Sequence, residues 1–226
     1  MLISGFDKVT LLNYPGLVAC TIFTKGCNLK CPFCHNSSLI SGNDDTYIDE
    51  DEIFKYLNKR KNIIEGVCIS GGEPLLQKDI KEFIRKIKLL GLKVKLDTNG
   101  TNPDLILSLI NDNLLDYIAM DIKNIKSKYE LTSGAKVKID NILKSINIIE
   151  NSGIDYEFRT TIIKEFHTLS DIDYISKKLD KKSKYYIQNF VKSDAVLDKN
   201  LHSFTSDELK EMKQILNNEN IIFRDL

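Results

Sequence analysis

Residues 25–36 read Lys25-Gly26-Cys27-Asn28-Leu29-Lys30-Cys31-Pro32-Phe33-Cys34-His35-Asn36, and they directly follow a run of β-forming residues, Leu17–Thr24. Three cysteines therefore lie within eight residues, on a loop at the C-terminal end of a predicted strand. Parallel α/β folds bind their ligands at that edge of the sheet. Because the loop is rich in Gly, Asn and Lys, it does not have the composition of a core. We interpret Cys27, Cys31 and Cys34 as metal ligands.

Outside this loop, apolar β-forming runs alternate with helical patterns. The expected strands are Leu17–Thr24, Gly66–Ser70, Lys93–Thr98, Tyr117–Ile122, Tyr156–Ile163 and Lys184–Phe190. The expected helices are Asp51–Lys61, Lys78–Leu90, Pro103–Asn111, Ile139–Asn151, Ser170–Leu179 and Ser206–Asn217. This alternation is typical of a parallel α/β sheet that is covered by helices. We therefore predict about six parallel β/α units in an open sheet or partial barrel. They form a single domain over residues 1–226, with a core at about 17–190 and a C-terminal helix and tail at 203–226.

The bulk composition is that of an ordinary globular protein. Its 226 residues include 32 Lys+Arg and 32 Asp+Glu, so the net charge is zero and no positive field attracts nucleic acid or an anionic membrane. No apolar run approaches the roughly 18 residues of a membrane span. Residues 1–13 show no secretory signal, so we expect the cytoplasm.

The cysteine count favours an iron–sulfur cluster over other metal centres. A zinc site needs a fourth ligand, and His35 is too close to Cys34 along the chain to share the same ion easily. Cys20 and Cys68 lie in predicted strands and are expected to be small buried hydrophobes. A 4Fe–4S cluster normally takes four cysteines, so three thiolates leave one iron open for a ligand.

The spacing Cys-x-x-x-Cys-x-aromatic-Cys, with Phe33 at the aromatic position, resembles the signature of the radical S-adenosylmethionine (radical SAM) superfamily. The resemblance implies that Cys27, Cys31 and Cys34 hold a 4Fe–4S cluster whose fourth iron is chelated by the methionine part of S-adenosylmethionine. It also implies a partial barrel of about six β/α units, which agrees with the independent strand count.

A second element, Ser70-Gly71-Gly72-Glu73-Pro74, directly follows the second expected strand. Its glycines allow close approach of backbone to a ligand, and Pro74 keeps Glu73 out of helical geometry. Carbonyls here and the Glu73 carboxylate can accept hydrogen bonds from an ammonium group. Alone, the motif could be a simple strand-to-helix turn. The family resemblance implies that Gly71, Gly72 and Glu73 receive the amino group of the cofactor.

Two further segments resemble the branch of the superfamily that activates glycyl-radical enzymes. Leu96-Asp97-Thr98-Asn99-Gly100 ends the third strand, and Met120-Asp121-Ile122-Lys123 ends the fourth. Asp121 and Lys123 alternate along a strand and so share a face. A surface ion pair is the plain alternative. The resemblance implies that Asp97 binds cofactor and that Asp121 and Lys123 bind its ribose and carboxylate end.

Other matches and departures concern the rim of the site. Cys34-His35-Asn36 matches the same branch and makes Asn36 a cofactor contact, while the role of His35 stays open. The segments 5–16 and 128–132 resemble the activating protein of anaerobic ribonucleoside-triphosphate reductase, although Asn13 stands where an acid is usual. Gln188 or Asn189 stands where many relatives have His. Arg159 and Thr161 are candidates to face the barrel, and His167 and His202 are expected in solvated loops.

The resemblance implies an enzyme that cleaves S-adenosylmethionine to a 5′-deoxyadenosyl radical. The expected electron donor is reduced flavodoxin or ferredoxin. The short chain leaves little for a lid over a small molecule, which favours a glycyl-radical enzyme partner such as anaerobic ribonucleotide reductase. One alternative is radical chemistry on a small molecule, such as deazapurine synthesis for tRNA modification. The other is a non-enzymatic iron–sulfur or zinc protein, which would have no use for Gly71, Gly72, Glu73 or the Asp121 and Lys123 pair.

Overall fold

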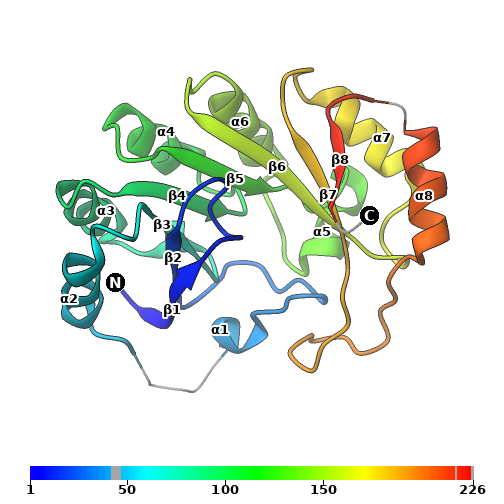
Figure 1. Ribbon diagram of the computed structural model, residues 1–226. Helices are drawn as coiled ribbons and strands as arrows, with labels where there is room; N and C mark the ends of the chain where they lie inside the picture. The colour runs from blue at the N-terminus through cyan, green and yellow to red at the C-terminus, as the bar shows by residue number, and fades with distance from the viewer. Residues whose placement is uncertain (42–46, 217, 225–226) are drawn as a thin grey trace.

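The computed structural model describes residues 1–41, 47–216 and 218–224, and the strands within them form one eight-stranded sheet (Figure 1). The strands are β1 (Ile3–Thr10), β2 (Ala19–Thr24), β3 (Gly66–Gly71), β4 (Lys93–Thr98), β5 (Tyr117–Asp121), β6 (Asp155–Ile162), β7 (Tyr185–Asn189) and β8 (Ile221–Phe223). Their order in space is their order in the chain. β1 pairs antiparallel with β2, and every later pair is parallel.

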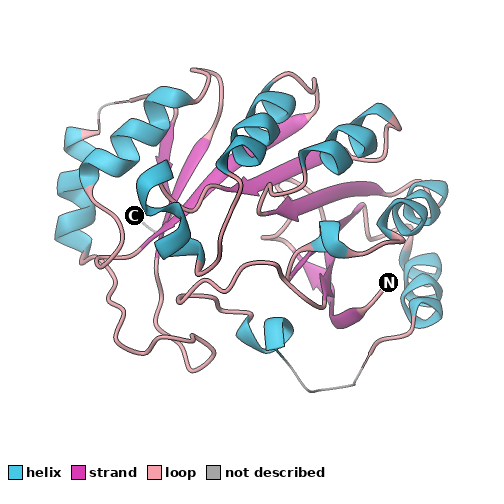
Figure 2. Cartoon of the chain, turned by 180° about the vertical axis from the view of Figure 1, so that it is seen from behind, coloured by secondary structure: helices cyan, strands magenta, loops and turns pink. Residues whose placement is uncertain are grey.

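Helices connect the parallel strands and lie mainly on one face of the sheet. They are α1 (Ser37–Ser41), α2 (Glu50–Arg60), α3 (Ile80–Leu89), α4 (Pro103–Asn111), α5 (Tyr129–Ser133), α6 (Ile139–Glu150), α7 (Leu169–Lys178) and α8 (Ser206–Ile215). Because each crossover steps to the next strand in the same direction, the longer helices collect on the outer face (Figure 2), as the general rule for the hand of parallel crossovers predicts. None of the helices among the described residues is long and apolar enough to cross a membrane.

The predicted partial barrel of about six β/α units is confirmed. Each expected strand and helix is present, with bounds that agree to within two residues. Asn217, the predicted end of the last helix, lies outside the described residues, as do 225 and 226 of the predicted tail. Beyond the predicted core at 17–190, the structure adds β1 and β8 at the two edges of the sheet. It also adds the short helices α1 and α5.

Local chemistry explains where the helices begin and end. Asn102 caps α4 by accepting from the backbone N–H of Leu105 at 3.2 Å, and Pro103 occupies the first turn. Thr168 forms a capping box with Asp171 at the start of α7. Gly91 follows α3 with a φ of 78°, the left-handed conformation that glycine adopts without strain.

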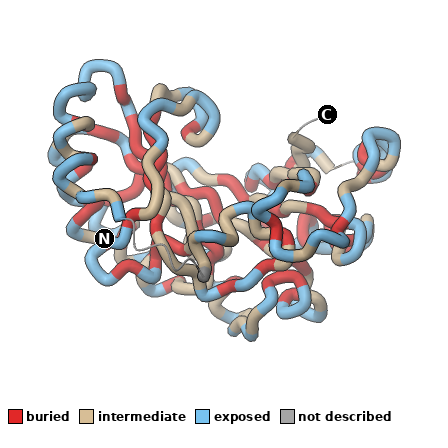
Figure 3. The backbone as a smooth tube through the Cα atoms, turned by 90° about the horizontal axis from the view of Figure 1, so that it is seen from below, coloured by how far each residue is buried: buried red, intermediate tan, exposed pale blue. Residues whose placement is uncertain are grey.

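Two groups of buried side chains hold the fold. The larger group joins the sheet to the inner sides of the outer helices, and buried positions accordingly follow the strands in Figure 3. The smaller group lies beside the cysteine loop and consists of Leu29, Cys31, Phe33, Ile163, Phe190, Val196 and Leu201. Apolar side chains of the loop are thus packed against the segment that follows β7.

Candidate active site

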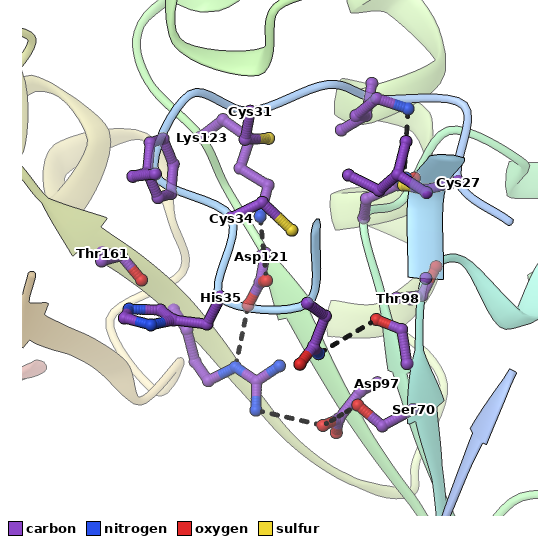
Figure 4. A pocket seen from close by; sticks show the side chains of 18 of the residues that line it. Cys27, Cys31, Cys34, His35, Ser70, Asp97, Thr98, Asp121, Lys123 and Thr161 are labelled. Carbon is purple, nitrogen blue, oxygen red and sulfur yellow. Dashed lines mark hydrogen bonds and ion pairs between the residues drawn. The ribbon is translucent and has the colours of Figure 1, made fainter. Parts of the chain in front are cut away.

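The loop after β2 and the C-terminal ends of β3 to β7 surround one cavity of about 270 Å³ (Figure 4). All but one of the side chains predicted to bind cluster or cofactor line it. They are Cys27, Cys31, Phe33, Cys34, Asn36, Gly71, Gly72, Asp97, Asp121 and Lys123. The exception is Glu73. Segments that are far apart in the sequence therefore meet at the edge of the sheet where ligands of parallel folds bind.

The three cysteines of the loop lie along one side of this cavity (Figure 4). A turn closed by the Cys34 N–H donating to the Cys31 carbonyl at 3.0 Å shapes the loop. The Leu29 N–H donates to Cys27 Sγ at 3.4 Å. Burial raises the pKa of all three thiols, and the positive charge of Lys123 opposes that rise.

The arrangement of the donors bears on which metal centre they suit. Among the residues that the structure describes, no three His, Cys, Asp or Glu side chains are grouped tightly enough to hold a single metal ion. A cluster attaches each thiolate to a different iron and so tolerates wider spacing of the ligands. Cys20 and Cys68 are fully buried in β2 and β3, as expected, and do not line the cavity. The loop therefore offers three thiols and no fourth.

Gly71, the last residue of β3, and Gly72 hold the cysteine loop against the sheet. The Gly72 N–H donates to the Thr24 carbonyl at 2.9 Å, and the Glu73 N–H donates to the Gly26 carbonyl at 2.8 Å. A Cβ on Gly71 would lie 2.3 Å from Thr24 N, and one on Gly72 would lie 1.9 Å from Gly26 O. Glycine is required here because the two backbones touch. The motif therefore positions the cysteines as well as lining the cavity.

The carboxylate of Glu73 is buried behind these loops. It accepts from the Leu75 N–H at 3.1 Å, the Thr98 hydroxyl at 2.8 Å and the Asn99 N–H at 2.7 Å. Burial raises its pKa to about 7, despite these three donors. The family resemblance gives this carboxylate a role toward the ammonium group of the cofactor, and that role stays a prediction. In the structure Glu73 joins the loops after β3 and β4, because three donors converge on it.

Four charged side chains line the part of the cavity nearest the sheet. Lys123 Nζ lies 3.0 Å from Asp121 Oδ2, and Arg159 Nε lies 2.9 Å from Asp121 Oδ1. Arg159 also reaches Asp97, with 3.5 Å between Nη1 and Oδ2. Burial disfavours the charged form of both acids and is the largest single influence on each. Arg159 together with a lysine, Lys95 beside Asp97 and Lys123 beside Asp121, outweighs burial and holds the pKa of each acid below its usual value. The site thus presents ionised acceptors beside cations.

The remaining rim candidates divide into those that face the cavity and those that do not. Asn36, which lines it, donates from Nδ2 to the Gly71 carbonyl at 3.4 Å. His35 also lines it, with Nδ1 3.3 Å from Ser193 Oγ. Gln188, Thr161 and Arg159 face the cavity. Asn189 faces away and bonds to the backbone of Phe204, at 2.8 and 3.1 Å.

Sequence reasoning was wrong about one histidine and missed several polar side chains. His167 is only 2% exposed, whereas a solvated loop was expected. Its Nε2 lies 2.8 Å from the Lys123 carbonyl, and its Nδ1 accepts from the Ile163 N–H at 3.2 Å. His202 is exposed, as expected. The missed group comprises Ser70, Thr98 and Asn99, which line the cavity and whose positions at strand ends were the available signal.

Comparisons with known proteins agree with this geometry. Residues 21–175 match the family described as the radical SAM superfamily. A Methanocaldococcus jannaschii protein named as a candidate glycyl-radical enzyme activating enzyme is 34% identical, over all of this chain and 96% of that protein. The pyruvate formate-lyase-activating enzyme of Clostridium pasteurianum is 27% identical, over 78% of this chain and 74% of that enzyme. The 7-carboxy-7-deazaguanine synthase of Methanospirillum hungatei is 41% identical, but over only 37% of this chain and 35% of that enzyme.

A solved structure shows the same fold. Streptococcus suis SuiB, bound to its precursor peptide SuiA, superposes with a TM-score of 0.69 at 18% identity. The match covers 90% of this chain and 48% of SuiB. The likeness supports the curved, mostly parallel sheet described above.

Proposed function

This chain belongs to the radical SAM superfamily, and from that premise we propose that it generates a glycyl radical on a partner enzyme, anaerobic ribonucleoside-triphosphate reductase. The observation that carries the proposal is the full-length match to a protein named as a candidate glycyl-radical enzyme activating enzyme. The segments 5–16 and 128–132, which resemble the activating protein of that reductase, support the choice of partner.

The donor set fits a 4Fe–4S cluster with one open iron. Cys27, Cys31 and Cys34 would hold it, since all three line the cavity and the described residues offer no fourth cysteine there. When bound, the cluster would supply the electron that cleaves S-adenosylmethionine into methionine and a 5′-deoxyadenosyl radical. The protein orients the sulfonium and keeps water away from it. All five cysteines are free thiols, which suits the reducing cytoplasm where we place the reaction.

The other cavity residues supply groups for each end of S-adenosylmethionine. The backbone at Gly71 and Gly72 offers carbonyls to the ammonium group. Lys123 provides a cation for the carboxylate, and Asp121 and Asp97 provide acceptors for hydroxyls. Asn36 and Phe33 complete the contacts, with Lys123 Nζ 6.0 Å from the centre of the Phe33 ring. A zwitterionic nucleoside matches this mixture of charges better than a simple anion or cation does.

The architecture supports a large substrate. The longer helices pack on the outer face of the sheet (Figure 2), so the inner face is left to the loops at the strand ends. A glycine-bearing loop of a partner enzyme can supply the missing cover, and its backbone glycine would donate the hydrogen atom. Reduced flavodoxin or ferredoxin would supply the low-potential electron. No role for a membrane or nucleic acid is proposed.

The test uses protein reconstituted with iron and sulfide without oxygen, reduced with dithionite and mixed with S-adenosylmethionine and anaerobic ribonucleotide reductase. We expect 5′-deoxyadenosine and a glycyl radical signal by electron paramagnetic resonance (EPR). Cys31→Ala should abolish both, while Cys20→Ala, a matched change in a buried strand, should keep both. Formation of 5′-deoxyadenosine without a glycyl radical signal on any partner enzyme would refute the proposal that a glycyl-radical enzyme is the substrate.

The short but closer match to a deazaguanine synthase makes small-molecule chemistry the second candidate. Product analysis separates the two. Formation of a deazapurine by the reconstituted protein would favour the second function, and its absence beside a glycyl radical signal would favour the first.

A further inference from the structure

We propose that Arg159 is the positioning residue of the cavity, and that it holds Asp97 and Asp121 side by side as two ionised hydrogen-bond acceptors for S-adenosylmethionine. The inference rests on the proposed function, because that function names the ligand. The proposed function assigns Arg159 no contact with the cluster or with S-adenosylmethionine, so the role of this side chain is an addition to it.

One guanidinium joins two neighbouring strands to its own. Arg159 on β6 is the register partner of Asp121 on β5, and its Nε lies 2.9 Å from Asp121 Oδ1. Its Nη1 extends to Asp97 on β4, 3.5 Å from Oδ2, and that oxygen also accepts from the Ser70 hydroxyl at 3.1 Å. Figure 4 labels Asp121, Asp97 and Ser70, and its dashed lines mark the contacts made at these side chains. The Arg159 side chain is only 14% exposed, so solvent screens the contacts weakly.

The charges around the two acids show when Arg159 matters. Lys95 forms an ion pair with Asp97, and Lys123 forms one with Asp121, so each acid has a lysine of its own in the described structure. A ligand carboxylate that binds Lys123 competes with Asp121 for that lysine. Asp121 then keeps Arg159 as its counter-ion.

Other groups bear on the same guanidinium and acids. Glu157 approaches Arg159 from the side away from the cysteines, with 3.8 Å between Oε1 and Nη1, and is itself paired with Arg224. Cys31 and Cys34 lie close enough to Asp121 to interact with it electrostatically. Negative charge on these sulfurs increases the need for a cation beside Asp121.

Arginine suits this role because its guanidinium is planar, always charged and able to bond two acceptors at once. A lysine at this position would present one point charge and neutralise one acid at a time. Without the arginine, two carboxylates on adjacent strands would repel each other, and the pair would tend to retain a proton. A protonated acid is a poorer acceptor for the ligand.

The experiment measures the dissociation constant of S-adenosylmethionine by anaerobic titration calorimetry, from pH 6 to pH 8.5, on reconstituted protein without reductant or partner. Arg159→Gln should raise the dissociation constant relative to wild type. The ratio of the two constants should grow as pH falls, by up to tenfold per pH unit if one proton is bound by the two acids in the variant. Arg159→Lys should raise the dissociation constant less than Arg159→Gln does, with the same direction of change with pH. Arg159→Gln combined with Asp97→Asn should bring the pH dependence back toward wild type. Arg85→Gln, on the outer helix α3, is the matched control and should match wild type.

The outcomes separate the inference from the proposed function. Wild-type protein that fails to bind S-adenosylmethionine would overturn both. Wild-type binding together with an unchanged constant in Arg159→Gln would overturn the inference alone. A deficit that is equal at every pH would also overturn it, because it indicates a merely structural arginine. If Arg159→Gln does not fold, Arg159→Lys decides the question by the same pH criterion.

Discussion

Asn99 donates its side-chain amide to Asn28 Oδ1 at 2.8 Å and so ties the loop after β4 to the cysteine loop 71 residues earlier. Asn28 in turn donates to the Thr101 hydroxyl at 2.8 Å, and Thr101 N–H donates back to Asn99 Oδ1 at 3.0 Å. The three side chains form a closed set of hydrogen bonds. Because Asn28 follows Cys27 directly, this set fixes the first of the three thiols.

Asn28→Ala should therefore loosen the cluster at Cys27. The change removes two hydrogen bonds, each worth about 0.5–1.5 kcal/mol net. We expect the reconstituted cluster to be lost several-fold faster to a chelator under argon, followed by visible absorbance and iron content. Asn58→Ala, whose amide bonds only within the exposed surface of α2, serves as the control. Equal rates of loss in the two variants would contradict this role for Asn28.

Gly72→Ala should displace the cysteine loop. The added Cβ would lie 1.9 Å from the Gly26 carbonyl oxygen, a backbone atom that cannot rotate away. We expect the variant to lose most of its iron and at least about 2 kcal/mol of unfolding free energy, as overpacking commonly costs. Gly91→Ala meets no atom within 4 Å and carries only the penalty of its positive φ, about 1 kcal/mol. The two variants, compared by urea unfolding and iron content, separate a steric effect from a conformational one.

The sequence predicts the six parallel β/α units because their strands are apolar and their helices carry local start and stop signals. The edges of the sheet are harder to predict. β1 has a largely polar, half-exposed pattern, and β8 is only three residues long. Neither carries the apolar run that identifies a buried strand. Each is held by pairing with one neighbour, which a single sequence does not reveal.

The sequence indicates which residues meet at the cavity where a motif carries the chemistry. It does not indicate burial that depends on contacts between distant loops. The positions of Cys27, Asp121 and Lys123 at strand ends place them at the cavity. The burial of Glu73 and His167 depends on donors and acceptors that come from other loops. A residue type alone does not show whether a polar side chain faces a cavity or closes a hydrogen-bond network behind it.

Glu73 should make the stability of the protein fall as pH rises. Its folded-state pKa, about 7, lies above its ordinary value of 4.5, so the folded state binds the proton more tightly. The stabilisation is fully present below pH 4.5 and is lost as pH rises through 7, at most about 3 kcal/mol at 1.36 kcal/mol per pKa unit. The lowered pKa values of Asp97 and Asp121 act in the opposite direction, but below pH 4.

The measurement is the difference in unfolding free energy between wild type and Glu73→Gln from pH 4 to pH 8. Because Gln does not titrate, this difference isolates Glu73 from the other groups. We expect the difference to shrink as pH rises through the window from 4.5 to 7. Glu82→Gln, an exposed change from Glu to Gln on α3, is the control for the substitution itself. A flat profile for Glu73→Gln would mean that the carboxylate has the same pKa in the folded and the unfolded protein, and would contradict this prediction.

His167 supports the cofactor cavity from behind, through the backbone of Lys123. Its Nε2–H donates to the Lys123 carbonyl while Nδ1 accepts from Ile163 N–H, an arrangement that requires the neutral ring. Burial lowers the pKa of His167 below its ordinary 6.5. The stabilisation is therefore fully present above pH 6.5 and is lost as pH falls through the folded-state pKa, opposite in sign to that of Glu73.

His167→Ala should leave the Lys123 carbonyl and the Ile163 N–H without their partner, at a cost of about 1–3 kcal/mol for each buried group. The end of β5 would then be free to shift, so S-adenosylmethionine should bind more weakly as well. His202→Ala removes an exposed ring paired with Glu165, and such surface pairs contribute at most about 1 kcal/mol. Urea unfolding at pH 7.5 and pH 5.5 should show a larger deficit for His167→Ala at the higher pH, because wild type gains the contribution of the neutral ring only there. A deficit that is the same at both pH values would show that His167 packs without titrating, and a deficit no larger than that of His202→Ala would show that the bond to Lys123 does not hold β5 in place.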